Sequence, residues 1–382
     1  MLNIILLGIT SFLTDVSSEM VYPLLPVYLV TVLGAGPAVL GLIEGVAESL
    51  ASITKVFSGY FSDKLKSRKP FTILGYFASA LGKVFLFLSI GWGFVLVGRL
   101  LDRFGKGVRT APRDALIADS TSKGKRGSAF GLHRAMDTCG AAVGVVLAYF
   151  LVSHYTGNFK RVFFYSLIPA FIGVLVLFLV KEKKEKRDEQ LGRKKISFSW
   201  KGLDKRLRLF LIFSFIFTLG NSSNQFLLLK AKDMGSPVTS VIILYLVFNV
   251  IQAVVIYPAS WLSDKIGKKK LLVAGYLFYG LVYLGFALNN SLGHLWILFA
   301  LYGIYMGLTE GVEKALIADI SPAGLRATTI GLHATIIGIG LLPASVLAGV
   351  LWKLFGAQAP FYFGSFMGIL ASCGFFFVLK GL

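Results

Sequence analysis

Cysteine is almost absent from this chain of 382 residues, which has only two. Cys139 and Cys373 each lie inside an apolar stretch, so we expect small packing residues, with no disulfide framework and no metal-ligand spacing. The sequence also has no phosphate-cradling loop of the Walker type and no spacing that pairs a nucleophile with a base. These absences argue against an ATP-driven transporter and against an enzyme, and we expect no cofactor and no metal site.

Long polar stretches are also missing, apart from one between residues 181 and 208. Hydrophobic residues make up 55% of the chain and the mean hydropathy is +0.74, so a water-soluble protein of this composition would aggregate. The apolar residues form blocks of roughly 20 to 27 residues, enough to cross a hydrocarbon core about 30 Å thick. We therefore predict an all-α membrane protein with twelve transmembrane helices. The spans are expected near residues 3–32, 38–62, 70–90, 92–118, 127–152, 162–180, 208–230, 237–263, 270–289, 292–318, 327–352 and 359–380.

Acidic residues are about half as numerous as basic ones, with 19 against 39 and a net charge of +20. The basic residues lie in alternate loops, which is the positive-inside pattern of membrane proteins and argues against nucleic-acid binding. Both termini are therefore expected in the cytoplasm, with the protein in a prokaryotic cytoplasmic (inner) membrane. The first apolar run lacks a preceding basic region and continues into Asp15 and Glu19, so we expect a first span and no cleaved signal peptide.

Parts of the sequence repeat after 200 residues. ALIAD occupies residues 115–119 and again 315–319, and GLH occupies 131–133 and 331–333. The chain is therefore predicted to contain two related six-helix bundles, residues 1–180 and 208–382, joined by a basic cytoplasmic linker over 181–207. Because each half has an even number of spans, the halves are parallel repeats, and a shared site is expected between them near the membrane midplane.

The loop after the second span carries a motif that is repeated in the second half. The copies read GYFSDK at 59–64 followed by SRK at 67–69, and SWLSDKIGKKK at 260–270. This motif resembles the loop 2–3 signature of the major facilitator superfamily, and Arg99 matches an arginine of that family's fourth helix. The resemblance implies a central cavity lined by the first, fourth, seventh and tenth helices. It also implies conformational roles for Asp63, Arg68 and Asp264, because such aspartates cap helices of the opposite half.

The fourth span has an unusual density of charge. Its charged residues recur every three or four positions and so share one helical stripe, which cannot face lipid. They are Arg99, Asp102, Arg103, Lys106, Arg109, Arg113 and Asp114. Since basic groups are in excess there, one interpretation is a strip that binds an anionic or zwitterionic solute, to which we assign the first four residues. The alternative is a pairing network that locks the halves together, and we assign Arg109, Arg113 and Asp114 to a gate.

Two acidic residues, Asp15 and Glu19, lie one turn apart in the first span. Carboxylates this close near the membrane middle repel each other, so one is expected to hold a proton near neutral pH. The second half has Asn221 and Gln225 at the matching positions, which keep the hydrogen-bonding capacity without the charge and are assigned to the solute site. Proton coupling, direct binding of a cation or amine, and a static salt bridge to Arg99, Arg103 or Lys106 all remain open.

The tenth span offers tyrosines followed by charged residues. Tyr302 and Tyr305 suit a solute-facing wall or plain packing against a neighbouring helix. Glu310, Glu313 and Lys314 are assigned to the gate. Glu313 takes the position of Arg113 in the repeat, so the two helix ends are predicted to attract each other when the cytoplasmic side closes. His133 and His333 recur in both halves, which favours a structural role over a proton relay.

These features together predict a secondary active transporter that works by alternating access and is coupled to the proton gradient. Export, and hence antiport, is slightly preferred to import. The alternatives are a multidrug or lipid exporter or flippase, and a receptor or sensor that kept the fold without transport. The expected partners are a small-molecule solute and membrane lipids, and the protein is expected to be a monomer.

Overall fold

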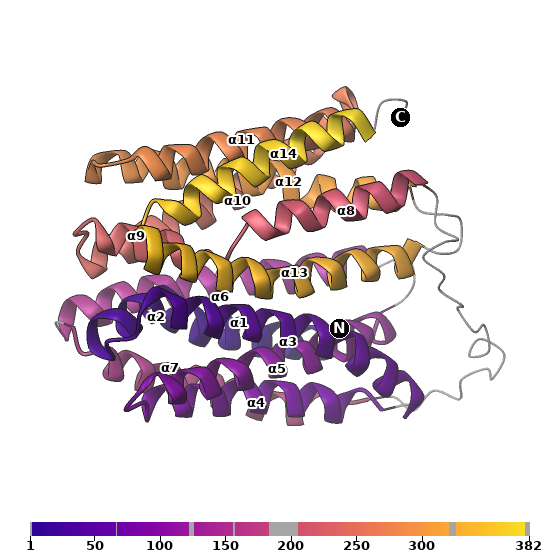
Figure 1. The fold of residues 1–382 in the computed structure, drawn as a ribbon. Helices are drawn as coiled ribbons and strands as arrows, with labels where there is room; N and C mark the ends of the chain where they lie inside the picture. The colour runs from indigo at the N-terminus through magenta and orange to yellow at the C-terminus, as the bar shows by residue number, and fades with distance from the viewer. Residues whose placement is uncertain are drawn as a thin grey trace.

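The apolar blocks of the sequence fold into long helices that lie side by side and run back and forth between the two ends of the bundle, from left to right in Figure 1. The computed structural model describes residues 2–65, 67–121, 126–155, 157–182, 205–320 and 326–378. Within these ranges the regular secondary structure is helical and contains no strand. We call the end of the bundle where α1 begins and α14 ends the terminus end, and the opposite end the distal end.

The first half contains six membrane-spanning segments. The first is continuous in space but changes its helical form around Pro23 and Pro26, because proline has no N–H to donate within a helix. It consists of α1 (Leu2–Val21), η1 (Tyr22–Leu24), α2 (Leu25–Val27) and η2 (Tyr28–Val32). The other five are α3 (Pro37–Lys64), α4 (Lys69–Phe87), α5 (Trp92–Asp119), α6 (Arg126–His154) and α7 (Phe159–Phe178).

The second half repeats this arrangement with one difference. Its first span is broken at residues 221–224 into α8 (Lys205–Gly220) and α9 (Gln225–Asp233). The following helices are α10 (Val238–Ile266), α11 (Lys268–Leu288), α12 (Leu292–Ile320), α13 (Arg326–Phe355) and α14 (Ala359–Val378). The predicted all-α architecture of twelve spans is therefore confirmed. The division into residues 1–180, 181–207 and 208–382 stays a prediction, because most of the linker lies outside the described residues.

Nine of the described helical segments are long and apolar enough to cross a membrane by composition alone. The three spans that fall short are α3, α5 and the broken pair α8 and α9. The charged residues of α3 and α5 lower the hydropathy, and the break shortens the other span. Because charge is costly in contact with lipid, α3 and α5 must direct it into the protein.

The two halves meet most closely where α3 crosses α13. A Cβ atom on Gly41 would overlap the backbone of Ser345, and one on Gly349 would lie 2.6 Å from the carbonyl oxygen of Pro37. Glycine at these two positions lets the helix backbones touch, as is common between membrane helices. Pro37 begins α3, so these contacts lie in the distal part of the bundle.

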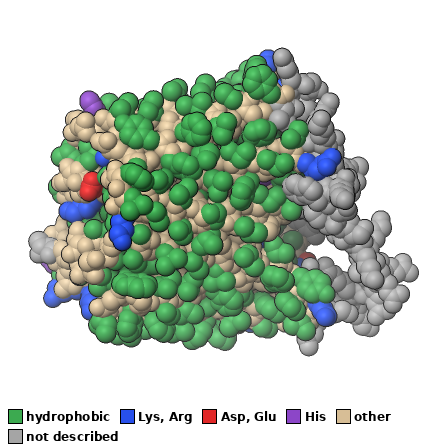
Figure 2. Space-filling view, viewed as in Figure 1, with side chains coloured by type: hydrophobic (Ala, Val, Ile, Leu, Met, Phe, Trp, Pro, Cys, Tyr) green, Lys and Arg blue, Asp and Glu red, His purple; other side chains and the backbone are tan. Residues whose placement is uncertain are grey.

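An apolar band surrounds the bundle. In Figure 2 hydrophobic side chains cover the middle of the visible face, while Lys and Arg lie towards its two ends. Exposed apolar side chains such as Phe150, Leu175 and Val254 have more than 60% of their surface accessible, with values of 62%, 65% and 67%. Apolar surface on this scale requires a lipid environment. The protein is a multi-pass integral membrane protein.

Candidate functional site

A small polar cavity lies between α1 and α5 in the first half. Its volume is ≈ 60 Å³, comparable to the space of about two water molecules. The cavity brings together the predicted coupling acids Asp15 and Glu19 with most of the charged stripe on α5. The lining residues are Asp15, Ser18, Glu19, Val21, Tyr22, Lys83, Leu86, Arg99, Asp102, Arg103, Lys106 and Arg109.

The most buried ion pair beside this cavity joins Arg99 to Glu44, a residue that sequence reasoning missed. Glu44 on α3 is fully buried and accepts two hydrogen bonds from Arg99, at 2.8 Å from Nε and 2.9 Å from Nη2. This parallel geometry is the strongest arrangement that a carboxylate and a guanidinium can adopt. In this conformation Arg99 therefore binds a carboxylate of the protein, whereas the sequence analysis predicted that it binds a solute.

Three further ion pairs extend the network, one of which joins Nη1 of Arg99 to Oδ2 of Asp102 at 3.6 Å. Glu48, one turn after Glu44, lies 3.1 Å from Nε of Arg103. Lys83 on α4 lies 3.1 Å from Oδ1 of Asp102 and is itself buried. Glu48 and Lys83 were also missed, although charged residues inside apolar spans were available as a signal.

These partners correct the expectation that basic groups are in excess. The network contains five acidic and five basic side chains. The acids are Asp15, Glu19, Glu44, Glu48 and Asp102, and the bases are Lys83, Arg99, Arg103, Lys106 and Arg109. A buried charge is tolerated when an opposite charge lies beside it, and α1 and α3 supply four carboxylates against the basic groups of α4 and α5.

The two acidic residues on α1 differ from those on α3 in their partners. Glu19 accepts a hydrogen bond of 2.7 Å from the hydroxyl of Tyr245, which belongs to α10 in the other half. Within the described part of the chain, neither Asp15 nor Glu19 forms an ion pair within 4.0 Å, and neither does Lys106. The static salt bridge, one of the three interpretations, is therefore not made in this conformation.

Other polar contacts join the two halves beside the break between α8 and α9. Ser223 donates to Oε2 of Glu44 at 3.3 Å, and the side-chain amide of Gln225 donates to the carbonyl oxygen of Tyr22 at 3.2 Å. Gln225, which the sequence assigned to the solute site, is completely buried at this contact. The charged network is thus connected to the second half through Glu44 and Glu19.

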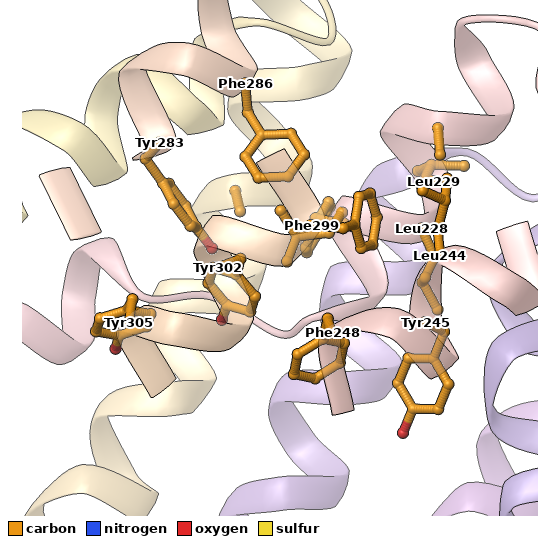
Figure 3. Packing of buried hydrophobic residues seen from close by; sticks show 14 of the residues in the cluster. Leu228, Leu229, Leu244, Tyr245, Phe248, Tyr283, Phe286, Phe299, Tyr302 and Tyr305 are labelled. Carbon is orange, nitrogen blue, oxygen red and sulfur yellow. The ribbon is translucent and has the colours of Figure 1, made fainter. Parts of the chain in front are cut away.

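The predicted solute-facing tyrosines lie in the packed interior of the second half. Tyr302 and Tyr305 are 0% and 2% exposed, and their rings pack among other aromatic side chains, as Figure 3 shows. The hydroxyl of Tyr302 donates to Asn224 at 2.7 Å, while Asn221 donates to the hydroxyl of Tyr305 at 3.4 Å. In this conformation Asn221 and both tyrosines therefore bind residues of their own half.

Arg113 and Glu313, the two residues predicted to attract each other across the halves, each contact residues of their own half. Arg113 donates to the neighbouring Asp114 at 2.9 and 3.0 Å. Glu313 accepts from the hydroxyl of Tyr276 at 2.7 Å and lies 3.2 Å from Nε2 of His333. Each candidate is thus bound within its own half, and their mutual attraction stays a prediction.

The remaining gate candidates are placed as follows. Glu310 accepts from the side chain of Gln252 at 2.8 Å, and Arg109 contacts Ser79 and lies over the ring of Tyr76. Arg68 forms an ion pair with Asp119, and in the second half Lys268 pairs with Asp319 at 2.6 Å. The side chains of Asp63, Asp264 and Lys314 lie outside the described residues.

Comparison with known proteins agrees with this architecture. Residues 7–229 and 209–381 each match the model of the Major Facilitator Superfamily. An uncharacterised MFS-type transporter of Methanocaldococcus jannaschii is 40% identical, covering 98% of this chain and 94% of its own length. The multidrug resistance protein MdtG of Escherichia fergusonii is 24% identical, covering 94% of this chain and 90% of its own.

Solved structures share the fold. The nucleoside transporter NupG matches with a TM-score of 0.81 at 15% identity, covering 100% of both chains. A D-xylose–proton symporter matches with a TM-score of 0.75 at 17% identity, covering 99% of this chain and 96% of the other. Both halves match the family model, and the archaeal relative extends over nearly the whole chain. The chain therefore belongs to the major facilitator superfamily, and it is a transporter by family and fold.

Proposed function

We propose that this protein is a proton-coupled secondary active transporter that exports a small anionic or zwitterionic solute. The observation that carries the proposal is the set of unpaired charges at the cavity. Asp15 and Lys106 have no ion-pair partner within 4.0 Å among the described residues, and Glu19 is held only by Tyr245. A zwitterion fits this set, because its anionic group can pair with Lys106 while its ammonium group pairs with a carboxylate on α1.

The same arrangement supports coupling to protons. A carboxyl group in the membrane interior without a cationic partner is stabilised either by a proton or by the cationic group of a solute. If the proton and the solute compete for Asp15 or Glu19, binding of one releases the other. Exchange of this kind between the two sides of a membrane is antiport, and the proton gradient then drives export.

The contact between the halves supports alternating access. The halves touch in the distal part and at midheight, where Ser49 donates to the carbonyl oxygen of Gly338 at 2.7 Å. Towards the terminus end, Phe57 and Tyr60 on α3 are more than half exposed, and the side chain of Lys106 is exposed as well. With both termini in the cytoplasm, as the loop charges predict, we infer that this conformation is open to the cytoplasm.

A multidrug exporter is the second candidate, because MdtG is related over most of the chain. The charge at the cavity favours a polar solute over a lipophilic cation, and a screen separates the two. Purified protein is tested for thermal stabilisation by anionic, zwitterionic and cationic solutes. We expect stabilisation by the first two groups. Stabilisation confined to lipophilic cations would support multidrug export and contradict our assignment.

Proton coupling is tested with Asp15→Asn in liposomes, using a compound that stabilised the protein in the screen. We expect the variant to lose the transport that an imposed pH gradient drives, while it still exchanges labelled for unlabelled compound. Asp233→Asn is the control, since it removes an exposed carboxylate at the end of α9, away from the cavity and the gate. Full gradient-driven transport by both Asp15→Asn and Glu19→Gln would contradict coupling through α1. If the wild-type protein binds the compound without transporting it, the protein is a receptor. If it transports labelled lipid between the two leaflets, it is a flippase.

A further inference from the structure

His133 and Asp137 on α6 form a buried polar pair that the proposed transport function does not use. Nδ1 of His133 lies 3.6 Å from Oδ2 of Asp137, and the two side chains are only 5% and 13% exposed. Their other polar atoms, Nε2 of His133 and Oδ1 of Asp137, are buried and have no hydrogen-bond partner among the described residues. Buried polar atoms rarely go without a partner, so these two atoms indicate a place where water enters.

The pair lies between the coupling acids and the terminus end. Contacts between α1 and α6 place Gly140 against Phe12 and Gly144 against Val16, so Asp15 lies about six residues, or roughly 9 Å, further from the terminus end than Asp137, and His133 lies one turn nearer that end. The three groups therefore form successive steps from the terminus end to the cavity.

The charged groups around His133 come from two helices. Asp137 and the exposed Arg134 lie on α6, while Arg113 and the partly exposed Asp114 approach from α5. Arg113 also donates to Ser11 on α1 at 3.3 Å, one turn before Asp15. The two acidic and two basic groups balance in charge, and Asp114, which is 42% exposed, can collect protons from solvent.

We propose that His133 and Asp137 carry protons between the terminus-end solvent and Asp15, an inference that rests on the proposed proton coupling. A proton binds at Nε2 of His133, and the proton on Nδ1 passes to Oδ2 of Asp137. Asp137 then releases a proton through water to Asp15, so each group returns to its starting charge. The imidazole is left with its proton on Nε2, and it returns to the Nδ1–H tautomer when water removes the proton from Nε2 and supplies one to Nδ1.

The second half supplies a control. His333 matches His133, but the position that matches Asp137 holds Ile337, and His333 contacts Glu313 on α12 instead. The matching histidine is equally buried, at 5% against 4%, and has no acidic residue one turn further along its helix. His333→Gln therefore reproduces the structural disturbance of His133→Gln without removing a step that leads to Asp15.

The test measures how fast a proton reaches α1. Full-length protein in liposomes is acidified rapidly, and time-resolved infrared spectroscopy follows the carboxylic acid signal that Asp15→Asn and Glu19→Gln remove. We expect His133→Gln to slow this signal about 100-fold, the contribution typical of a positioned proton-transfer group, with its final amplitude unchanged. Asp137→Asn should slow it too, added imidazole should restore the rate in His133→Ala, and His333→Gln should leave it unchanged.

The outcomes separate the two proposals. A wild-type rate in both His133→Gln and Asp137→Asn would overturn the relay and leave proton coupling through α1 intact. Equal slowing by His133→Gln and His333→Gln would show a structural effect and would also overturn the relay. A wild-type protein in which neither Asp15 nor Glu19 gains a proton on acidification would overturn the relay and the proposed coupling together.

Discussion

The two halves of this transporter place different chemistry at matching positions of the same fold. In the first half Lys83 and Asp102 form a buried ion pair across α4 and α5. At an offset of 200 residues, α11 and α12 carry Tyr283 and Tyr302, whose ring centroids lie 6.1 Å apart. Arg99 is likewise replaced by Phe299, which is completely buried.

The difference shows that two halves with the same fold can be stabilised in different ways, the first by buried ion pairs and the second by aromatic packing. Ion pairs stabilise the first half only while every partner is present, because a lone buried charge is strongly destabilising. Aromatic packing in the second half depends on buried area and tolerates small losses. We therefore expect the charge state of the first half to change when protons or charged solutes bind. The packing of the second half, which faces the first, is expected to change little.

The largest effect is expected from Glu44→Ala, because it leaves Arg99 buried without its bidentate partner. Loss of one member of a buried pair typically lowers the free energy of unfolding by about 3–5 kcal/mol. Thermal unfolding in detergent measures the loss. The control is the double variant Glu44→Leu with Arg99→Leu, which removes both charges and should recover much of the stability. A double variant as unstable as Glu44→Ala would contradict the view that the loss comes from Arg99 missing its bidentate carboxylate.

The spans could be predicted from sequence because a helix must be long and apolar to cross a membrane, and this requirement acts locally. One boundary was missed, since residues 221–224 interrupt the span expected over 208–230. Asn221 and Asn224 compete with the helix for backbone hydrogen bonds, so a signal for the break was present. The repeat shows which matching positions differ in chemistry between the halves, because matching positions can be compared without coordinates.

The partners in the charged network could not be predicted in the same way. The spacing on α5 showed that its charges share a stripe, but it did not show that Glu44 and Glu48 approach from α3 or Lys83 from α4. Such pairs depend on how helices far apart in sequence cross each other. The apparent excess of positive charge came from reading α5 alone, and the solute roles of the α5 residues stay a prediction.

A smaller effect is expected in the second half from Tyr302→Phe, which removes the hydrogen bond to Asn224 and keeps the ring packing. Loss of one such bond lowers the free energy of unfolding by about 1 kcal/mol. The matched variant in the first half is Asp102→Asn, which leaves Lys83 without a charged partner and should cost more. Thermal unfolding of both variants tests the comparison directly. A larger loss for Tyr302→Phe than for Asp102→Asn would contradict the division into a charged half and an aromatic half.

The smallest effect is expected at the terminus end. There Arg113 and Glu313 carry opposite charges at matching positions, and the prediction is that their attraction favours closure of the two halves. Both residues are bound within their own half in this conformation, so their attraction can contribute only when the terminus end closes. Partly exposed ion pairs contribute about 0.5 kcal/mol, which is roughly a twofold shift in an equilibrium. Spin-label distances between the two halves at the terminus end should therefore show about twofold less closed protein in Arg113→Ala. Exchanging the charges, with Arg113→Glu and Glu313→Arg together, should restore the closed fraction, because the attraction is preserved. If Arg113→Ala leaves the distribution unchanged, the two charges are structural features of their separate halves, and closure depends on other contacts.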